Sequence, residues 1–513
     1  MMKKLKIAGI RPGTLINNLT TTVSPSLPIG LAYALAAIKD LDVDIIAIDG
    51  FGESPLIKKA KKFSERNIII GLDNNEIVSR LEKFDPDVVL ITCMFSSDWL
   101  LIKNLINDIK NKNPECVIIG GGEHFTALTE FSFKESKIDC IVLGEGEDTI
   151  REITLKMLSG EYGKEPIEGA YIRVGDKILK GEDRKRIRNL EKMPWPAWEY
   201  FDVNTMLDSG IGNTSFGTDN FRPMTLNATR GCPYECTFCS NPQMWGRLWR
   251  ARPVEDILAE MKFLIKRYRA NHFDFTDLTL AVKKQWLKEF CEMMVKEKLP
   301  VTWGVPSGTR VEVLDHEMLK LLKEAGLNDI TYAPESGSPR MLKIIKKKIN
   351  VKQFIQSLKN AVKTKLRTRI NIIIGFPDET RYNFFETLLF ACKTAYIGVD
   401  DLLVMGLSIY PGSEDYNRVR KEKGVKLDEK YFDELTEQGS LGFSPCYSNH
   451  YTRLELNIYK YLIWVSFYSI SLICRPVRIW KLLKDLFQQR GSTRLSMGLI
   501  NLSKRLRASF RSH

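Results

Sequence analysis

Three cysteines lie close together in one stretch of the chain, Cys232, Cys236 and Cys239, at spacings of four and three residues. Thiolates from such a loop can hold three irons of a cubane cluster and leave the fourth iron without a protein ligand. An open metal position of this kind lets a cluster bind and activate a small molecule. A structural zinc site is an alternative, but it needs a fourth ligand close by, and no second Cys-x-x-Cys or His-x-x-x-His follows. A chance grouping of buried cysteines is a second alternative.

Length and composition bound the class of protein. A chain of 513 residues is too long for a single core, so we expect two or three domains. Its 44% hydrophobic and 27% charged residues are typical of a folded globular protein. Ten cysteines, together with an N-terminal apolar run that breaks at Arg11, favour a reducing cytoplasm over export.

The positive charge is concentrated at the C-terminal end. The formal net charge is +13. From Arg475 onward a single acid, Asp485, accompanies ten basic residues: Arg475, Arg478, Lys481, Lys484, Arg490, Arg494, Lys504, Arg505, Arg507 and Arg511. The rest of the chain is therefore only mildly basic, which argues against a nucleic-acid partner.

Residues 1–155 alternate short apolar runs with helical patterns, which predicts a parallel, doubly wound, Rossmann-like sheet. The expected strands are Lys6–Ile10, Val43–Ile48, Val88–Thr92, Val117–Ile119 and Ile138–Leu143, and the expected helices are Pro28–Lys39, Glu76–Phe84 and Leu100–Lys110. Such sheets bind ligands at the carboxyl ends of their strands, where small residues let a large ligand approach the backbone. Here those ends are Thr92–Ser97, Gly120–His124 and Gly144–Glu147. Each glycine turn, taken alone, also fits a tight connection.

Residues 156–222 are expected to form a linker with a small β insertion. Its parts are Ala170–Val174, Lys177–Leu179, the Pro/Trp segment Met193–Trp198, and Asn204–Asn220, which is rich in Gly, Ser and Thr. We expect the aromatic residues of this linker to pack against the domain that follows.

Residues 223–425 repeat strand and helix six times, which predicts an open, partial (β/α)6 barrel with its catalytic edge at the strand carboxyl ends. The expected strands are Met224–Thr229, His272–Thr276, Val301–Gly304, Asp329–Ala333, Thr368–Gly375 and Leu402–Ile409. Helices such as Val254–Tyr268, His316–Glu324 and Phe384–Thr394 lie between them, and Asp315 is the expected N-cap of the second.

Residues 426–513 form a basic helical region. The apolar stretch Leu456–Cys474 has an uncharged run of 14 residues from Tyr461, shorter than the roughly 20 that span a membrane, so we expect a helix buried on the barrel or at an interface. The stretch after it places apolar residues on one helical face between Arg478, Lys481 and Lys484. This pattern suits an anionic membrane surface, and core packing is the alternative.

The segment NATRGCPYECTFCS around the three cysteines resembles the cluster motif of the radical S-adenosylmethionine (SAM) enzymes, in the subclass that also binds cobalamin. The resemblance implies a [4Fe-4S] cluster held by Cys232, Cys236 and Cys239, with SAM chelated by the open iron and Phe238 beside the adenine. Electron transfer into the sulfonium would cleave SAM to methionine and a 5′-deoxyadenosyl radical. The oxygen sensitivity of such a cluster fits an anaerobic cell.

Further segments resemble the SAM-binding parts of that family. Pro334–Ser338 is similar to its Gly-x-Glu-x-Gly-Ser segment, which assigns Glu335 to the ribose hydroxyls and Ser336 to the same site. Ile374–Thr380 is similar to its glycine-proline turn, with Gly375 and Pro377 near adenine. A solvated loop acid is the alternative for Glu335.

Three charged residues have less certain counterparts in the family. Asp277 stands where the family often has an acid, although the surrounding Asp-Asp-x-Phe motif is altered. Arg310 and Arg369 could neutralise the SAM carboxylate, or could form exposed ion pairs instead.

The N-terminal domain resembles the cobalamin-binding domain of the same subclass over about its first 150 residues. It lacks the Asp-x-His-x-x-Gly pattern, so the resemblance implies cobalamin held without a histidine ligand; an empty, degenerate domain is the alternative. The residues that it assigns to cobalamin are Thr92, Ser96, Gly120, Gly121, Gly122, His124, Gly144 and Gly146.

The resemblance implies a cobalamin-dependent radical SAM methyltransferase acting on an unactivated carbon. One SAM would methylate cob(I)alamin and a second would supply the radical that abstracts hydrogen from the substrate. The catalytic residues beyond the cofactors are unknown. A cyclase or oxidoreductase with the same cofactors is the alternative within the enzyme class, and a non-catalytic corrinoid-binding or membrane scaffold is the alternative outside it. A methylthiotransferase fits less well because Cys93, Cys116 and Cys140 do not have the spacing of a second cluster.

The expected partners follow from this chemistry. They are an external electron donor of the flavodoxin or ferredoxin type and an unknown substrate, for which the basic tail suggests a lipid or isoprenoid. We expect a cytoplasmic protein with peripheral contact at the inner face of the membrane through the C-terminal region.

Overall fold

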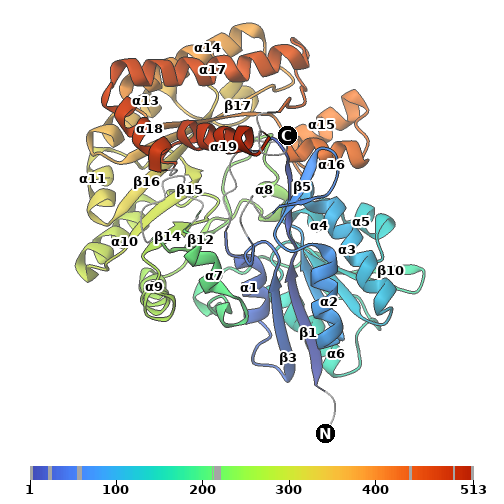
Figure 1. Cartoon of the computed structure of the whole chain (residues 1–513). Coiled ribbons are helices and arrows are strands. Elements are labelled where there is room, and N and C mark those ends of the chain that lie inside the picture. Colours follow the sequence, from blue (N-terminus) through green and yellow to red (C-terminus); the bar gives the residue numbers. More distant parts are fainter. Residues whose placement is uncertain are drawn as a thin grey trace.

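The computed structural model describes residues 4–20, 26–54, 60–210, 212, 221–437, 442–488 and 491–509. Figure 1 shows two α/β units side by side, the N-terminal unit in blue and cyan and the second in green to orange, with the last helices in red against the second unit. Part of the predicted linker Asn204–Asn220, namely residue 211 and residues 213–220, lies outside the described residues.

The N-terminal unit is built on a seven-stranded sheet in the order β10-β9-β8-β7-β6-β1-β3. Five strands are parallel: β1 (Leu5–Arg11), β3 (Val43–Asp49), β6 (Val88–Thr92), β7 (Val117–Gly121) and β8 (Cys140–Val142). In chain order these are arranged 2-1-3-4-5, a common doubly wound topology. The predicted fold of this domain is confirmed.

Helices cover both faces of this sheet because its strands are apolar on both sides. Along β6, Val88 and Leu90 join the core beneath one set of helices, whereas Val89 and Ile91 join the core on the other side. The first face carries α1 (Ile29–Ala36) and α6 (Glu147–Leu158); the second carries α2 (Asn74–Phe84), α3 (Trp99–Lys112), α4 (Glu123–Ala127) and α5 (Thr129–Glu135). A small antiparallel sheet of β2 (Thr14–Asn17), β4 (Lys61–Lys62) and β5 (Asn67–Ile70) lies beside them.

The hairpin expected within the linker extends the N-terminal sheet. Strand β9 (Ala170–Val174) pairs antiparallel with β8, and β10 (Lys177–Lys180) pairs with β9 at the edge. The sheet therefore continues past residue 155, where we had placed the end of the domain. An edge hairpin has no local signal for the sheet that it joins, so the sequence could not place it. The helix α7 (Val203–Asp208) follows in the linker.

The second unit is an open barrel of six parallel strands in sequential order, as predicted. The strands are β11 (Pro223–Leu226), β14 (His272–Phe275), β15 (Thr302–Thr309), β16 (Leu327–Glu335), β17 (Arg367–Ile374) and β18 (Asp401–Gly406). Its helices are α9 (Val254–Tyr268), α10 (Lys284–Glu297), α11 (His316–Glu324), α12 (Pro339–Ile344), α13 (Val351–Lys363) and α14 (Arg381–Ile397). Asp315 caps α11 by accepting a hydrogen bond from the Met318 amide, as expected.

The chain after the last barrel strand begins with α15 (Glu414–Lys423), and the region after residue 425 is helical, as predicted. Its helices are α16 (Glu429–Thr436), α17 (Arg453–Cys474), α18 (Val477–Gln488) and α19 (Arg494–Ser509). The last three lie against the barrel, whereas α16 packs on the N-terminal unit, where Thr436 donates a hydrogen bond to Asn67. Helix α17 lies along the edge strand β18, because Leu456 meets Gly375 beyond the carboxyl end of β17 and Tyr468 donates a hydrogen bond of 2.5 Å to Asp401 at the start of β18. An open sheet edge is thereby covered.

Two hydrophobic cores cross from one unit to the other. One includes Leu35 of α1, Trp198 of the linker and Met224 of β11. The other joins Val89 of β6 to Phe432 of α16 and to Phe376 after β17. Shared cores of this kind fix the two carboxyl edges relative to each other.

Candidate active site

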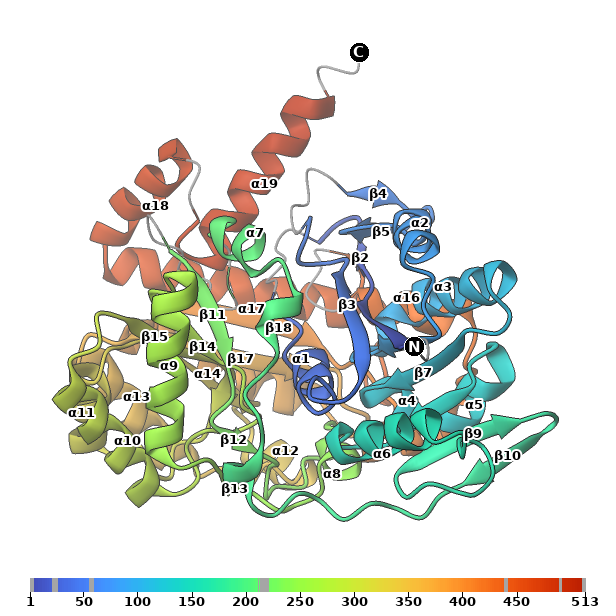
Figure 2. The same cartoon turned by 90° about the horizontal axis from the view of Figure 1, so that it is seen from below.

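The cysteine loop begins at the end of a two-strand ribbon, β12 (Thr229–Arg230) and β13 (Arg250–Ala251). It ends in the short helix α8 (Asn241–Met244). Figure 2 shows these elements together at one end of the barrel, with α18 and α19 at the opposite end. The loop is held from outside as well: Thr237 donates a hydrogen bond of 2.8 Å to Asp415 of α15, and its amide bonds the carbonyl of Ile345 at 3.2 Å.

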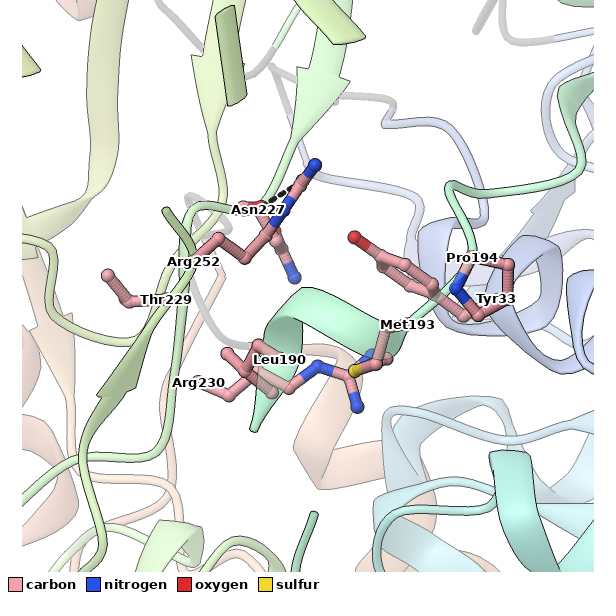
Figure 3. A pocket seen from close by; sticks show the side chains of 8 residues that line it. All are labelled: Tyr33, Leu190, Met193, Pro194, Asn227, Thr229, Arg230 and Arg252. Atoms are coloured by element: carbon pink, nitrogen blue, oxygen red, sulfur yellow. Dashed lines mark hydrogen bonds between the residues drawn. The ribbon is translucent and has the colours of Figure 1, made fainter. Parts of the chain in front are cut away.

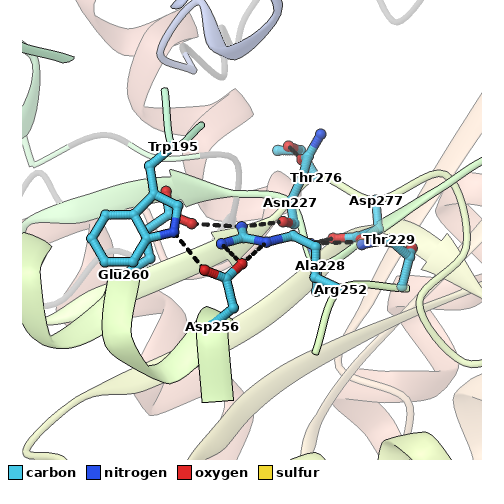
Figure 4. A network of polar contacts seen from close by, with 9 residues as sticks. All are labelled: Trp195, Asn227, Ala228, Thr229, Arg252, Asp256, Glu260, Thr276 and Asp277. Carbon is cyan, nitrogen blue, oxygen red and sulfur yellow. Dashed lines mark hydrogen bonds and ion pairs between the residues drawn. The ribbon is translucent and has the colours of Figure 1, made fainter. Parts of the chain in front are cut away.

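Asp277, whose role the altered motif left open, supports the residues before the loop. It is 1% exposed and accepts hydrogen bonds from the amides of Ala228 and Thr229 and from the hydroxyl of Thr229. Burial raises its pKa to about 6, although these hydrogen bonds oppose the shift. Asp277 is therefore a structural anchor of the strand that leads to the cysteines (Figure 4).

A second anchor in the same network is Arg252. It bonds the carbonyl of Asn227 at 3.0 Å and forms ion pairs with Asp256 and Glu260 of α9. The indole of Trp195 donates a hydrogen bond of 2.8 Å to the other carboxylate oxygen of Asp256 (Figure 4). This linker tryptophan therefore packs on the barrel, as expected.

The donor set fits a cluster better than a single metal ion. Cys232, Cys236 and Cys239 are free thiols and are partly exposed. Within the described part of the chain, no three His, Cys, Asp or Glu side chains come close enough to share one ion. A cubane needs its three thiolates on three different irons, which spreads the sulfurs apart. Burial raises the pKa of Cys239 to about 12 and also raises that of Cys232 and Cys236.

Two cations face this loop and partly offset the effect of burial on Cys232 and Cys236. They are Lys347 and Arg310. The Arg310 guanidinium lies 3.7 Å from the centre of the Tyr234 ring, inside the loop, and donates 2.7 Å to the carbonyl of Lys347. Arg310 also pairs with Glu312, so its predicted contact with the SAM carboxylate stays a prediction.

Lys347 is the functional candidate that the sequence did not reveal. Its ammonium donates 2.9 Å to Glu335, and both side chains are at least nine-tenths buried. It also lies 5.7 Å from the centre of the Phe238 ring. In the sequence Lys347 stands within a run of three lysines, a pattern typical of a solvated surface.

The backbone around this ion pair is strained on both sides. Glu335 has a φ of +65°, and Lys346 and Lys348 have φ of +53° and +52°. Among the described residues, Glu335 is the only non-glycine with positive φ at the end of a strand; three of the others, Asp85, Arg269 and Lys298, are helix C-caps. Strain of this kind persists where the surroundings impose it, and it clusters at ligand sites.

The remaining SAM candidates lie around this pair. The ring of Phe238 is 5.9 Å from that of Phe376 in the turn that contains Gly375 and Pro377. The Ser336 hydroxyl, however, is 1% exposed and bonds Thr387 of α14 at 2.9 Å, so it holds the turn together. The structure gives the Ser336 side chain no free surface for a ligand.

Arg369, our other candidate for the SAM carboxylate, lies at the wrong end of the barrel. It is the third residue of β17 and pairs in register with Asp401 at the start of β18. Its side chain forms an ion pair of 3.3 Å with the same aspartate. The suggested contact of Arg369 with the SAM carboxylate is wrong, because the catalytic edge of a parallel barrel is at the carboxyl ends of its strands. The alternative, an ion pair, is what forms, although it is buried and not exposed.

The carboxyl edge of the N-terminal sheet has open space beside it. Thr92 and Gly121 are register partners at the ends of β6 and β7, and a methyl group added to Gly121 would meet nothing within 4 Å. Beyond Thr92, Met94 is 40% and Phe95 56% exposed. We call this edge the Thr92–Gly121 ledge: Gly121 has no side chain, and exposed apolar residues lie beside it. Such a surface suits a large planar ligand such as a corrin.

The other glycines of this edge are explained by the packing of the protein itself. A side chain at Gly120 would strike Phe125, one at Gly122 would strike the Cys93 carbonyl, and one at Gly144 would strike Arg186. Gly146 precedes α6 as its N-cap. Their backbones line the same edge, and their contact with cobalamin stays a prediction.

His124 and Ser96 are buried in the core of the N-terminal domain. His124 is 1% exposed, its ring stacks 4.5 Å from Trp99, and its Nδ1 lies 2.9 Å from the Ser96 hydroxyl. Burial lowers the pKa of His124 to about 3. The prediction that these two side chains contact cobalamin is not supported, because neither has free surface.

The two carboxyl edges meet each other. A side chain added at Gly412, after β18, would touch both Ala127 of α4 and Gln243 of α8. Helix α4 follows the Gly120–Gly122 turn, and α8 follows Cys239. The glycine edge of one domain and the cysteine loop of the other therefore border the same region.

A buried ion cluster holds this junction. Arg230 pairs with Glu147 at 2.5 Å and with Glu145 at 3.2 Å, and Arg250 pairs with Glu145 at 2.9 Å. Burial alone would raise the pKa of Glu147, but Arg230 outweighs it and holds that pKa below its usual value. The Arg230 guanidinium also lies 4.8 Å from the centre of the Tyr33 ring, across a small pocket where α1, the linker and the barrel meet (Figure 3).

The comparisons with known proteins agree with this arrangement. Residues 226–391 match the radical SAM superfamily, and residues 18–154 match the B12 binding domain. The chain is a B12-binding member of the radical SAM superfamily. The expected cofactors, a [4Fe-4S] cluster, SAM and cobalamin, are confirmed for this B12-binding radical SAM enzyme, as is its fold class. Which side chains hold each cofactor stays a prediction.

Similar proteins carry related activities. An uncharacterized methyltransferase of Pyrococcus horikoshii is 27% identical over 96% of each chain. Cytidylyl-2-hydroxyethylphosphonate methyltransferase of Streptomyces wedmorensis is 26% identical, with 68% of this chain and 69% of the relative covered. An anaerobic magnesium-protoporphyrin IX monomethyl ester cyclase of Rubrivivax gelatinosus is 25% identical over 62% of this B12-binding chain and 56% of the cyclase.

Solved structures share the fold of this radical SAM protein. The cobalamin-dependent SAM radical enzyme OxsB, with aqua-cobalamin and SAM bound, superposes with a TM-score of 0.68 at 17% identity, covering 99% of this chain and 75% of OxsB. The radical SAM methyltransferase TsrM of Kitasatospora setae, with cobalamin and a [4Fe-4S] cluster bound, superposes with a TM-score of 0.63 at 14% identity, covering 83% of this chain and 80% of TsrM.

Proposed function

We propose that this enzyme is a cobalamin-dependent radical SAM methyltransferase that methylates an unactivated carbon. The observation that carries the proposal is the meeting of two ligand edges, the cysteine loop and the glycine edge of the N-terminal sheet, at Gly412, where an added side chain would touch both α8 and α4. Methyl transfer between two cofactors needs them held close and in fixed orientation.

The cofactors supply the difficult chemistry: a radical from SAM at the cluster and a transferable methyl group on the corrin. The residues of the chain position and enclose them. Cys232, Cys236 and Cys239 would hold the cluster. Lys347 and Glu335 would fix one side of SAM, and the ledge beside Gly121 would receive the corrin. The methyltransferase names of two relatives support this choice of reaction.

The test begins with the protein reconstituted anaerobically with iron, sulfide and hydroxocobalamin. Given SAM and a strong reductant, it should form both 5′-deoxyadenosine and S-adenosylhomocysteine, the products of radical cleavage and of methyl donation. Cys232→Ala is the control. Formation of 5′-deoxyadenosine without S-adenosylhomocysteine, with cobalamin bound, would remove the case for methyl transfer.

A cyclase is the second candidate, because one relative is a magnesium-protoporphyrin IX monomethyl ester cyclase. The mass of the product separates the two reactions. Methylation adds one CH₂ unit to the substrate, whereas ring closure removes hydrogens.

The partners are also proposals. An external one-electron donor of the flavodoxin or ferredoxin type would reduce the cluster, as radical SAM enzymes require such a donor. We propose a lipid or isoprenoid as the substrate class, since α17, which carries much of the apolar surface described below, packs at the catalytic edge: Leu456, on its buried side, lies against Gly375.

A further inference from the structure

Apolar side chains gather on the outer faces of three helices, α14, α17 and α18. Of the 25 large apolar side chains exposed in the described part of the chain, 15 belong to these helices. They are Tyr382, Phe385, Leu389 and Tyr396 of α14, Leu454, Ile458, Tyr461, Leu462, Val465 and Ile473 of α17, and Val477, Ile479, Trp480, Leu483 and Phe487 of α18. We call this set the apolar face. A concentration of this size marks a binding surface.

Helix α17 forms the centre of the apolar face. Its inner side packs on the barrel through Leu456, Ile463 and Phe467, whereas its outer side, after the exposed Arg453 at the N-terminal end, is apolar apart from Ser469. The one charge in the middle of the helix, Lys460, points inward and donates hydrogen bonds to Gly442 and Ser444. By length and composition α17 is the only described helix that could cross a membrane, yet its packing along β18 makes it a surface helix.

Helix α14 lies parallel to α17 and widens this face. Arg381 pairs with Glu455 at their N-terminal ends, and Arg475 bonds the last carbonyls of α14 at the other end. The rings of Phe384 and Tyr459 stack between them at 3.8 Å. In Figure 1 the two helices form the outermost layer at the top of the molecule.

The charged residues that α18 turns outward have one sign. Arg475 and Arg478 bind the protein itself, since the guanidinium groups of both donate hydrogen bonds to backbone carbonyls at the end of α14. The one acid of α18, Asp485, is 9% exposed and accepts hydrogen bonds from Ser492. The charged residues of α18 that remain outward are Lys481 and Lys484. The helix therefore presents an apolar strip bordered by lysines.

We propose that the apolar face binds the surface of an anionic lipid bilayer, with α17 lying in the plane of the interface. Apolar side chains would enter the acyl region while lysines meet anionic headgroups, and Tyr461 and Trp480 are amphipathic side chains typical of that depth. A second copy of the chain fits less well, because joining two such faces would bring Lys481 and Lys484 of both copies together. This inference does not depend on the proposed reaction.

The test is flotation of the reconstituted enzyme with vesicles of phosphatidylcholine and phosphatidylglycerol. The wild type should float with these vesicles and lose binding at high salt. The double variant Leu462→Glu and Val465→Glu should bind about 100-fold more weakly, since two inserted apolar side chains are lost. A matched double variant, Leu155→Glu and Val295→Glu, makes the same changes at exposed positions of α6 and α10 and should float like the wild type.

Charge reversal at Lys481 and Lys484 tests the lipid headgroups separately. It should weaken binding to anionic vesicles about ten-fold or more and leave binding to pure phosphatidylcholine unchanged. Formation of 5′-deoxyadenosine without lipid should be equal in all variants, which controls for folding. Failure of the wild type to float, or equal flotation of the Leu462/Val465 variant, overturns the proposal. A wild-type dimer that this variant dissociates, with no vesicle binding, would assign the face to a second copy.

Discussion

Arg230 of the barrel and Glu147 of the N-terminal domain form a buried ion pair of 2.5 Å. Arg230 lies two residues before Cys232, the first of the three predicted cluster cysteines. Glu147 is the first residue of α6 and follows the Gly144–Gly146 turn of the other ligand edge. This contact therefore joins the two domains beside both cofactor sites and helps, with the shared cores, to fix how the sites face each other.

The first prediction concerns this contact. Glu147→Gln keeps the shape of the side chain and removes its charge. We expect normal iron and cobalt content and 5′-deoxyadenosine formation within about two-fold, while S-adenosylhomocysteine falls about 100-fold, because a shift of about 1 Å between reacting groups can cost that much. Chromatography of both products measures the ratio. Glu130→Gln, which removes an exposed pair with Lys180, is the control; an equal fall of both products would mean a role in folding alone.

The second prediction concerns the cysteine loop. Cys232→Ala should lose most of the about four irons expected per chain and keep the one cobalt, because the two sites use different domains. Metal analysis after anaerobic reconstitution measures both. Cys291→Ala, a buried cysteine of α10, should keep both metals. Loss of cobalt together with iron in Cys232→Ala would contradict separate sites.

The third prediction separates the structural role of Lys347 from its role in SAM binding. Lys347→Met leaves Glu335 buried without its partner and should cost about 3–5 kcal/mol of stability. The double variant Lys347→Met and Glu335→Gln removes both charges and should regain most of that stability. If the pair contacts SAM, the double variant still binds SAM at least about ten-fold more weakly, as measured by anaerobic equilibrium dialysis. Full recovery of SAM binding would show that the pair is structural.

The fourth prediction is a pH dependence from Glu379. It is buried and accepts hydrogen bonds from the Gly375 amide and from Tyr451 at 2.5 Å. Burial raises its pKa from 4.5 to about 7. A carboxyl with a raised folded pKa contributes stability below the unfolded value and loses it as the pH rises through the folded one, here from about 4.5 to 7.

The expected loss across that interval is about 3 kcal/mol for the apoprotein. Thermal unfolding at pH 5 to 8 measures it. Glu379→Gln should flatten this part of the profile, while Asp378→Asn, at the partly exposed neighbouring position, should leave the slope in place. A Glu379→Gln profile as steep as that of the wild type would contradict the assignment.

Local patterns were sufficient for most of the fold. The short, continuous apolar run Val88–Thr92 gave β6 with its observed bounds, and the 3.6-residue pattern gave α9 and α11. The β9–β10 hairpin could not be placed, because edge pairing depends on a partner strand elsewhere in the chain.

The site was only partly predictable. Cysteine spacing predicted the cluster loop, and glycines predicted the ligand edge of the first domain; both stay predictions. His124 is an example of a residue that the sequence could not place. Its position after the glycines suggested contact with cobalamin, but its ring packs against Trp99 and is buried. Whether a side chain faces a ligand or the core is decided by neighbours that are remote in sequence.

The sequence by itself determined the order of the elements and the basic tail and predicted the three cluster cysteines, because each is encoded by residue type and short-range spacing. Only the tertiary structure decided that Lys347 faces the cysteine loop, that Arg230 meets Glu147, and that the acid of α18 points inward. Each of these depends on segments distant in the chain that pack together and bury a charge. A charge can be buried only where an opposite charge or hydrogen-bonding groups offset the loss of its hydration.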